Sequence, residues 1–162
     1  MGELTHFNME KRARMVDVTD KPAALRTATA EGSVYMQPET LALVRAGTLA
    51  KGDVLAVAQV AGIMAAKRTS ELIPMCHPVS LTGVDLSFEE QDSPCGVRIR
   101  ASVRCKGETG VEMEALTACS VAALTVYDMC KAVQRDMMIG DIQLVRKTGG
   151  THGDYQRGDA AP

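Results

Sequence analysis

The sequence predicts an α+β domain built on an antiparallel sheet. Apolar residues alternate with polar ones over 97–106, which is typical of a strand with one covered face. Two segments, 51–72 and 111–133, are rich in apolar residues at helical spacing and predict two long, largely buried helices. Shorter strand candidates before and after them complete the order βαββαβ. We therefore expect a ferredoxin-like fold with the helices packed on one face of the sheet.

The N-terminal region is expected to contain an arm, a short strand and a short helix. Residues 1–30 are polar and mixed in composition, so we expect a partly ordered arm there. Residues 34–36 are the first strand candidate. A helix is expected to begin at Pro38, because proline is favoured at the first helical position, and to end at Gly47.

The first long helix, over 51–72, is followed by a loop that contains two prolines. Pro74 ends the helix, and Pro74 and Pro78 together restrict the backbone on both sides of Cys76 and His77. Ionisable side chains at the ends of buried helices are costly to keep unless they have a partner or a function. This loop is therefore a candidate binding segment.

Two strands are expected to form a hairpin within 79–106. The alternation changes parity at Gly83, which predicts a β-bulge, and turn residues occupy 91–96. The polar face of the hairpin carries four basic side chains. We interpret it as a solvated face, and a subunit contact is the alternative. These side chains are Arg98, Arg100, Arg104 and Lys106.

The second long helix, over 111–133, leads to a last strand candidate at 142–145 and then to a Gly-rich tail. We expect the tail, 149–162, to be flexible. The ferredoxin-like domain is accordingly expected to span 31–148.

The composition argues against several classes of protein. Aromatic residues make up only 3% of the chain, which leaves few for a surface that stacks nucleic-acid bases. The net charge of −2 provides no basic field for a polyanion. No apolar run reaches the roughly 18–20 residues of a membrane span, and the first residues lack the apolar stretch of a signal peptide. The five cysteines include no CxxC pair, which fits reduced thiols in a cytoplasmic protein, with Cys105, Cys119 and Cys130 in the core.

The second long helix carries ionisable groups at both ends. Asp128 and Lys131 share a face, either as a surface ion pair or as part of a site. Glu112 and Glu114 lie in the first turn, where compensation of the helix dipole is the alternative to a binding role. Glu114 and Asp128 project from nearly the same face but lie about 21 Å apart at roughly 1.5 Å per residue. Two copies of the helix packed antiparallel would bring them together, so we expect a dimer whose sites combine residues of both subunits.

The first long helix adds further candidates. Lys51 lies at its start, where a cation opposes the helix dipole; this favours anion binding, with an exposed lysine as the alternative. Lys67 lies near the helix end, where cations are normal. Cys76 has no identifiable base beside it, so His77 is the better candidate for a donor or an acid. Two adjacent residues cannot build a metal site alone, so we expect no metal.

Three segments resemble a known family. They are KGDVLAVAQVAGIMAAKRTSELIPMCHP, TGVEMEALTACSVAALTVYDMCKAVQRDM and IGDIQLVRKTGG, and together they resemble the molybdenum cofactor biosynthesis protein C family, the cyclic pyranopterin monophosphate synthases. The N-terminal LTHFNMEKRARMVDVTDKP is similar as well, so the resemblance covers nearly the whole chain. It implies a ferredoxin-like catalytic domain, dimers assembled into a hexamer as a trimer of dimers, and a site at the dimer interface.

The resemblance also implies a reaction and its residues. The substrate would be 3′,8-cyclo-7,8-dihydro-GTP, which a preceding radical SAM enzyme makes, and functional coupling to that enzyme is expected. The products would be cyclic pyranopterin monophosphate and pyrophosphate. The reaction would use no cofactor. Lys51, Lys131 and Asp128 match catalytic positions. Substrate-binding positions are implied at Met75, Cys76, His77, Glu112, Met113, Glu114, Lys67 and Lys147. The family pattern has a lysine shortly after the Gly-Gly pair, where this chain has Thr151 and His152.

These residue types suit the implied chemistry. A guanine or pterin edge offers adjacent N–H donors to a carboxylate such as Glu112 or Glu114, and lysines suit a triphosphate. Rebuilding the ring requires repeated proton transfers, for which Asp128, a lysine and His77 are candidates. Burial or a like-charged neighbour would lower a lysine's pKa and make it a better proton shuttle.

Two other classes of protein are alternatives. A non-catalytic ligand sensor would explain a dimer with an anion site, but it would not need two lysines and an aspartate together. RNA binding through the sheet is disfavoured by the few aromatic residues and the negative net charge.

Overall fold

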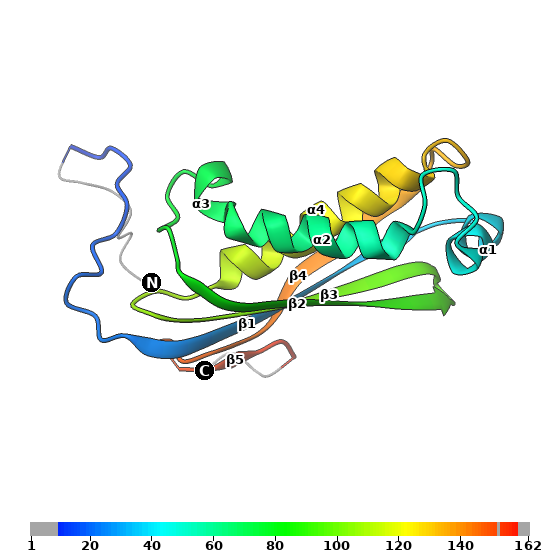
Figure 1. The fold of residues 1–162 in the computed structure, drawn as a ribbon. Helices are drawn as coiled ribbons and strands as arrows, with labels where there is room; N and C mark the ends of the chain where they lie inside the picture. The colour runs from blue at the N-terminus through cyan, green and yellow to red at the C-terminus, as the bar shows by residue number, and fades with distance from the viewer. Residues whose placement is uncertain (1–9, 152, 159–162) are drawn as a thin grey trace.

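A single antiparallel sheet forms the base of the molecule. A computed structural model of the chain describes residues 10–151 and 153–158. Within this part of the chain, the strands follow the order β2-β3-β1-β4-β5 across the sheet (Figure 1). The strands are β1 (Ala24–Tyr35), β2 (Leu81–Asp92), β3 (Cys95–Gly107), β4 (Met138–Thr148) and β5 (Tyr155–Gln156).

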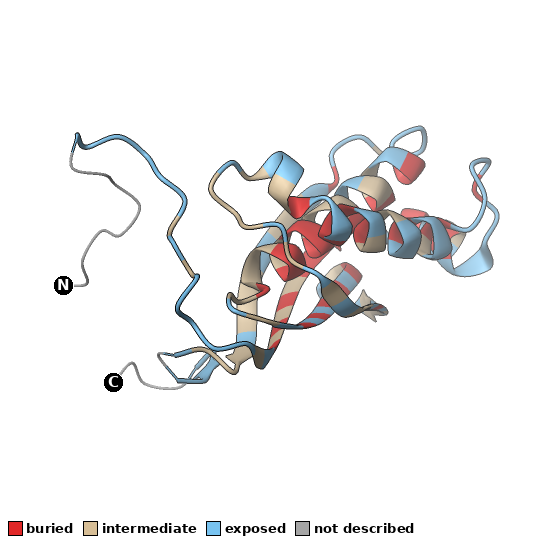
Figure 2. Cartoon of the chain, turned by 60° about the vertical axis from the view of Figure 1, so that its left-hand side comes forward, coloured by how far each residue is buried: buried red, intermediate tan, exposed pale blue. Residues whose placement is uncertain are grey.

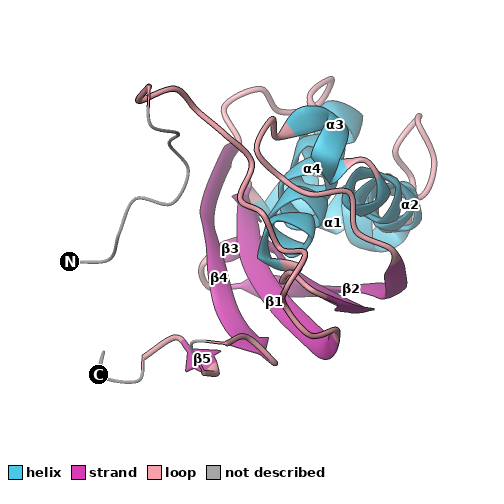
Figure 3. Cartoon of the chain, turned by 90° about the vertical axis from the view of Figure 1, so that its left-hand side faces the viewer, coloured by secondary structure: helices cyan, strands magenta, loops and turns pink. Residues whose placement is uncertain are grey.

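The helices lie together on one face of this sheet (Figure 3). They are α1 (Pro38–Ala46), α2 (Val54–Lys67), α3 (Thr69–Leu72) and α4 (Glu112–Cys130). Helices α2 and α4 run side by side in opposite directions, so the end of α2 lies near the start of α4 (Figure 1). Strand β1 lies between β3 and β4, and every neighbouring pair is antiparallel. The predicted ferredoxin-like arrangement is confirmed.

Several local predictions are confirmed as well. Helix α1 begins at Pro38 and ends at Gly47, whose φ of 62° is the left-handed conformation that favours glycine at a helix end. The register of β2 against β3 shifts between Leu81 and Gly83, as the predicted bulge requires. On the open face of the sheet, Arg100 forms an ion pair with Glu31 of β1.

The strands extend further than predicted. Strand β1 includes 24–30, which the sequence analysis assigned to the arm. Its buried positions there are Arg26, Ala28 and Ala30, and they alternate with Thr27 and Thr29. Such a pattern has little contrast in hydropathy. Strand β4 covers 138–148 rather than 142–145, and its register against β1 shifts twice, which breaks the alternation. The tail contributes β5, which pairs with β4.

The first long helix begins later than predicted. Asp53 is its N-cap and accepts a hydrogen bond from the Ala56 N–H at 3.0 Å, so α2 starts at Val54. Lys51 therefore precedes the helix, in a turn with Gly52 at φ 92°, and does not lie within the first helical turn. At its other end, α2 stops at Lys67 and a separate turn of helix, α3, follows.

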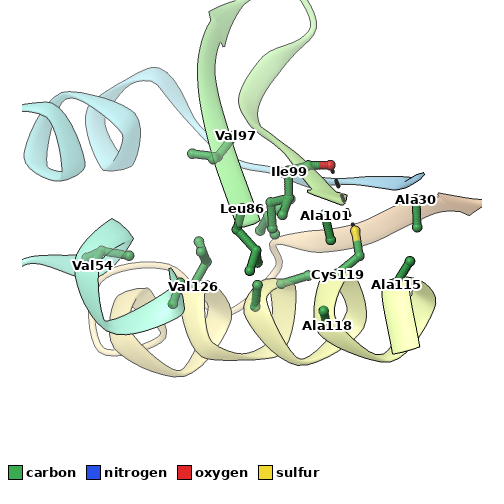
Figure 4. Packing of buried hydrophobic residues seen from close by; sticks show 14 of the residues in the cluster. Ala30, Val54, Leu86, Val97, Ile99, Ala101, Ala115, Ala118, Cys119 and Val126 are labelled. Carbon is green, nitrogen blue, oxygen red and sulfur yellow. Dashed lines mark hydrogen bonds between the residues drawn. The ribbon is translucent and has the colours of Figure 1, made fainter. Parts of the chain in front are cut away.

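Small side chains fill the space between the helices and the sheet. Figure 2 shows the buried residues concentrated between these two layers, and Figure 4 shows their packing at close range. Cys119 of α4 lies with its Sγ 3.8 Å from the Ile99 carbonyl oxygen of β3. The prediction that Cys105, Cys119 and Cys130 are core residues is confirmed, since each is 0% exposed.

Helix α2 approaches its neighbours closely at Gly62. A Cβ at this position would lie 2.5 Å from Leu86 Cδ2 of β2 and 3.0 Å from the Ala118 carbonyl oxygen of α4. The second contact is with helix backbone, which cannot move aside as a side-chain end can. Gly62 therefore sets the spacing of both helices above the sheet.

Replacing Gly62 with valine is expected to lower the free energy of unfolding by about 1–3 kcal/mol, because overpacking a close contact strains the surrounding core. Urea unfolding followed by circular dichroism measures this change. Gln59→Val, at an exposed position of the same helix, is the matched control and is expected to change the free energy by well under about 1 kcal/mol. Equal effects of the two substitutions would contradict the role of Gly62 as a spacer.

Candidate active site

A cavity of about 330 Å³ opens at the N-terminal end of α4. Its wall comes from the loop after α3, from the first turn of α4 and from the arm, which contributes Val16, Val18 and Lys21. Six residues singled out in the sequence line it. They are Met75, Cys76, His77, Glu112, Met113 and Glu114.

The arm fixes the orientation of His77. The Nε2 atom of His77 lies 2.6 Å from the Val16 carbonyl oxygen. Because a carbonyl oxygen only accepts hydrogen bonds, Nε2 carries the proton and donates it. In the neutral ring, Nδ1 is then the acceptor, so the arm selects one tautomer of this histidine.

Glu114 is the buried acid of the cavity. It is only 4% exposed, and burial, with a smaller contribution from the nearby Glu112 carboxylate, raises its pKa above the ordinary value. Burial also raises the pKa of the neighbouring Cys76 thiol, with Glu114 adding to the effect. Cys76 is therefore held as a thiol, which does not favour a nucleophilic role.

A second, more polar cavity of about 160 Å³ adjoins the first and shares Lys21, Thr109, Gly110 and Glu112 with it. At the wall of this second cavity, the Lys147 ammonium group lies 3.0 Å from Glu112 Oε1. Thr151 of the tail also lines it. His152, the other residue at which the chain departs from the expected pattern, lies outside the described residues.

Lys51, Asp128 and Lys131 form a cluster at the opposite end of α4. Lys51 Nζ lies 2.7 Å from Asp128 Oδ2 and 2.9 Å from the Asp128 carbonyl oxygen, and Lys131 Nζ lies 2.6 Å from Asp128 Oδ1. The hydrogen bonds from Lys131 and Lys51 lower the pKa of Asp128 to about 2. The same contact with Asp128 raises the pKa of Lys131, which is the opposite of the shift that favours a proton shuttle. All three side chains are about half exposed.

The structure thus divides the predicted site residues into two groups. The cavity group lies at the start of α4 and the Lys51–Asp128–Lys131 cluster near its end, about 21 Å away at roughly 1.5 Å per residue. Lys67 is exposed at the end of α2, near the first group, but it lines neither cavity. One small ligand cannot contact both groups within a single chain.

Sequence reasoning missed two contributors to this region. Lys21 lines both cavities, and Arg26 of β1 lines the second one. Lys21 lies in a segment assigned to a partly ordered arm, and Arg26 lies in the part of β1 that was not recognised as strand. Recognition of β1 would have placed Arg26 on its buried face.

The part of the chain that the structure describes shows neither a membrane-spanning helix nor a metal cluster. None of its helices combines the length and apolarity that a membrane span requires. In residues 10–151 and 153–158, no three His, Cys, Asp or Glu side chains converge as metal ligands would.

This fold, with acids, lysines and a histidine around small adjoining cavities, defines an α+β enzyme of small-molecule metabolism. The chain belongs to the MoaC family, whose sequence model matches residues 15–150. It is 61% identical over 154 residues to the cyclic pyranopterin monophosphate synthase of Thermoanaerobacter sp. (strain X514), covering 95% of this chain and 98% of that protein. The proteins of the same name from Brevibacillus brevis (59% identity; 97% and 98% covered) and Desulfitobacterium hafniense (61%; 97% and 96%) are similarly related.

The burial of Glu114 predicts a pH-dependent stability. The pKa of Glu114 is higher in the folded chain than in the unfolded one, so the folded chain binds the proton more tightly. The free energy of unfolding therefore falls as pH rises from the unfolded pKa to the folded pKa of this group. Glu114→Gln is expected to remove this fall. Urea unfolding between about pH 4 and 8 tests it, with Glu89→Gln, an exposed acid of β2, as the control. Parallel pH profiles for wild type and Glu114→Gln would refute the prediction.

The Asp128 contact predicts the behaviour of Lys131. Asp128→Asn is expected to lower the pKa of Lys131, because the hydrogen bond to the carboxylate raises it. An NMR titration of the lysine Cε and Nζ signals measures the shift. Asp136→Asn is the control. It removes a carboxylate that accepts a hydrogen bond from Gln134, and it is expected to leave the pKa of Lys131 unchanged. An unaltered Lys131 pKa in Asp128→Asn would show that the contact does not persist in solution.

Proposed function

We propose that this protein is a cyclic pyranopterin monophosphate synthase, which converts 3′,8-cyclo-7,8-dihydro-GTP to cyclic pyranopterin monophosphate and pyrophosphate. The observation that carries the proposal is the identity of about 60% to synthases of that name over nearly the full chain. The cavities are consistent with it, because they offer carboxylates for a base edge beside cations for phosphates.

The first cavity suits the guanine-derived ring. The Glu112 carboxylate and the buried Glu114 can accept hydrogen bonds from adjacent ring N–H groups, and the raised pKa lets Glu114 also donate when protonated. His77 can accept a proton on Nδ1 while the arm holds Nε2–H. Met75, Cys76 and Met113 supply apolar contact around the ring. Acid and base groups thus surround the part of the substrate that must be rearranged.

The second cavity suits the phosphates. Lys147, Lys21 and Arg26 line it, and the cavity adjoins the first one through Glu112. An anion there would compete with Glu112 for the Lys147 ammonium group. Charge-assisted contacts of this kind stabilise phosphate oxygens and the departing pyrophosphate. Lys67, exposed near this end of the molecule, is a further proposed contact for the triphosphate.

The Lys51–Asp128–Lys131 cluster is proposed to supply protons. With a pKa of about 2, Asp128 stays a carboxylate at neutral pH and orients both ammonium groups. The lysines are then the donors, and Asp128 is their anchor rather than the acid. Since the cluster carries one more positive than negative charge, it also attracts an anionic substrate.

We further propose that two subunits share each site. Helix α4 separates the cluster from the cavities in one chain, and an antiparallel second copy would bring them together. The outer faces of the helices present apolar side chains that a second copy would cover. Exposed ones are Val57, Val60 and Met64 of α2 and Leu124 of α4. The same proposal includes the assembly of three such dimers into a hexamer. It also includes functional coupling to the preceding radical SAM enzyme and a reaction without cofactors.

Lys51→Ala is expected to lower turnover of the cyclo-dihydro-GTP substrate by at least about 100-fold, because it removes a proposed proton donor. Formation of pyrophosphate and of the pterin product is measured with wild type and variant. Lys106→Ala, which removes an exposed lysine of β3, is the matched control and should keep full activity. Tight substrate binding by wild type without any product would favour a ligand sensor instead.

Mixing two inactive variants tests the shared site. Lys51→Ala and Glu114→Gln disrupt opposite ends of α4, so a mixed dimer retains one intact site, and random mixing should restore about a quarter of wild-type activity. Lys51→Ala mixed with Lys131→Ala is the control, because both changes affect the same end and every site stays defective. Recovery of activity in the control mixture would contradict a site shared between subunits. Failure of both mixtures to recover activity would contradict it as well.

A further inference from the structure

Among the residues that the structure describes, Arg26 is a buried cation without a carboxylate partner. It lies in β1, is only 5% exposed, and takes part in none of the ion pairs within the described residues. Its guanidinium group instead donates to two backbone carbonyl oxygens: Nε to Gly107 at 2.8 Å and Nη1 to Gly149 at 3.0 Å. A buried charge is costly, so its retention here calls for a reason beyond the packing of the core.

The two carbonyl groups belong to the loops that carry the second cavity. Gly107 ends β3 and begins the loop that leads to Glu112, whereas Gly149 follows β4 two residues after Lys147. The loops are far apart in sequence, and Arg26 is the side chain that hydrogen-bonds both. Between them lies the contact of 3.0 Å from Lys147 Nζ to Glu112 Oε1.

The chain around Gly149 packs tightly against β1. A Cβ on Gly149 would lie 2.0 Å from the Leu25 carbonyl oxygen, and the φ of this residue is +80°. Beside it, the hydroxyl groups of Thr27 and Thr148 are 2.7 Å apart, and the Gly149 N–H donates to Asp154 Oδ1 at 3.1 Å. The loop is therefore held at its base, and Arg26 links this base to the loop before α4.

We propose that Arg26 is a positioning residue of the reaction, which acts through the Gly107 and Gly149 carbonyl groups to keep Lys147 and Glu112 in contact at the wall of the second cavity. The planar guanidinium group presents two donors in a fixed geometry, which a lysine cannot reproduce. The inference rests on the proposed function for its substrate, but the contacts that support it do not.

The proposal predicts that Arg26 acts through Lys147. Arg26→Lys keeps the positive charge but loses the fixed pair of donors, so KM for the cyclo-dihydro-GTP substrate should rise about tenfold with kcat changed by less than about threefold, as loss of ground-state binding implies. Lys147→Ala should raise KM to a similar extent. The double variant should resemble Lys147→Ala alone rather than show the product of both effects, about 100-fold, because non-additivity marks a shared role.

Pyrophosphate binding, measured by calorimetry, makes the test independent of turnover. The same cycle of wild type, Arg26→Lys, Lys147→Ala and the double variant should show the same non-additive loss of affinity. If wild type lacks turnover but this cycle is non-additive, the proposed function fails and the positioning role stands. Additive losses would overturn the positioning role even with an active wild type.

A matched control separates positioning from stability. Arg45→Lys alters an arginine that pairs with Glu90 and Asp92, away from both cavities, and should leave KM and pyrophosphate affinity unchanged. Should Arg26→Lys lower the thermal midpoint while KM and affinity stay at wild-type values, Arg26 would be structural only. Arg26→Gln keeps a hydrogen-bond donor without the charge, and it replaces Arg26→Lys in these measurements if Arg26→Lys does not fold. Its loss of affinity must also be non-additive with that of Lys147→Ala.

Discussion

The length of helix α4 is the constraint on which the arrangement of the ionisable groups depends. Glu112 and Glu114 lie in its first turn, and Asp128 lies near its last residue, so the packed helix fixes a separation of about 21 Å. The buried face of the helix consists largely of small residues. Among these are Ala115, Ala118, Ala122 and Ala123, all 0% exposed. A small ligand therefore cannot contact both groups within a single chain.

The two ends of α4 shift the pKa values of their carboxyl groups in opposite directions. At the start of the helix, burial raises the pKa of Glu114, so this carboxyl group holds its proton to a higher pH than an exposed glutamate does. At the other end, two exposed ammonium groups hold the pKa of Asp128 at about 2, so this group stays a carboxylate, and the contact with Asp128 raises the pKa of Lys131. Groups whose environments separate their pKa values can act as distinct acids and bases in one reaction. A shared site would place these two environments on opposite sides of one substrate.

The sequence was sufficient where a pattern has a period or a strong local signal. The alternation over 97–106 predicted β3, and Pro38 and Gly47 bounded α1 as the structure has it. The helix ends and the two prolines singled out Cys76, His77, Glu112 and Glu114, and the resemblance to a family added Met75 and Met113. The structure brings these six residues together. In contrast, β1 was mostly missed, because alanine and threonine give weak contrast between its two faces.

Contacts between a side chain and distant backbone left no signal in the sequence. The Val16 carbonyl oxygen that fixes the His77 ring belongs to a residue 61 positions away, and any residue there would supply the same group. Arg26 meets carbonyl groups 81 and 123 positions away, for which residue type is equally uninformative. The first contact orients the His77 ring in the first cavity, and the second joins two chain segments that line the second cavity. The arm and the segment after β4 lie at the same end of the molecule as the start of α4 (Figure 1), so the shape of this end depends on chain segments that pattern reasoning assigns to the periphery.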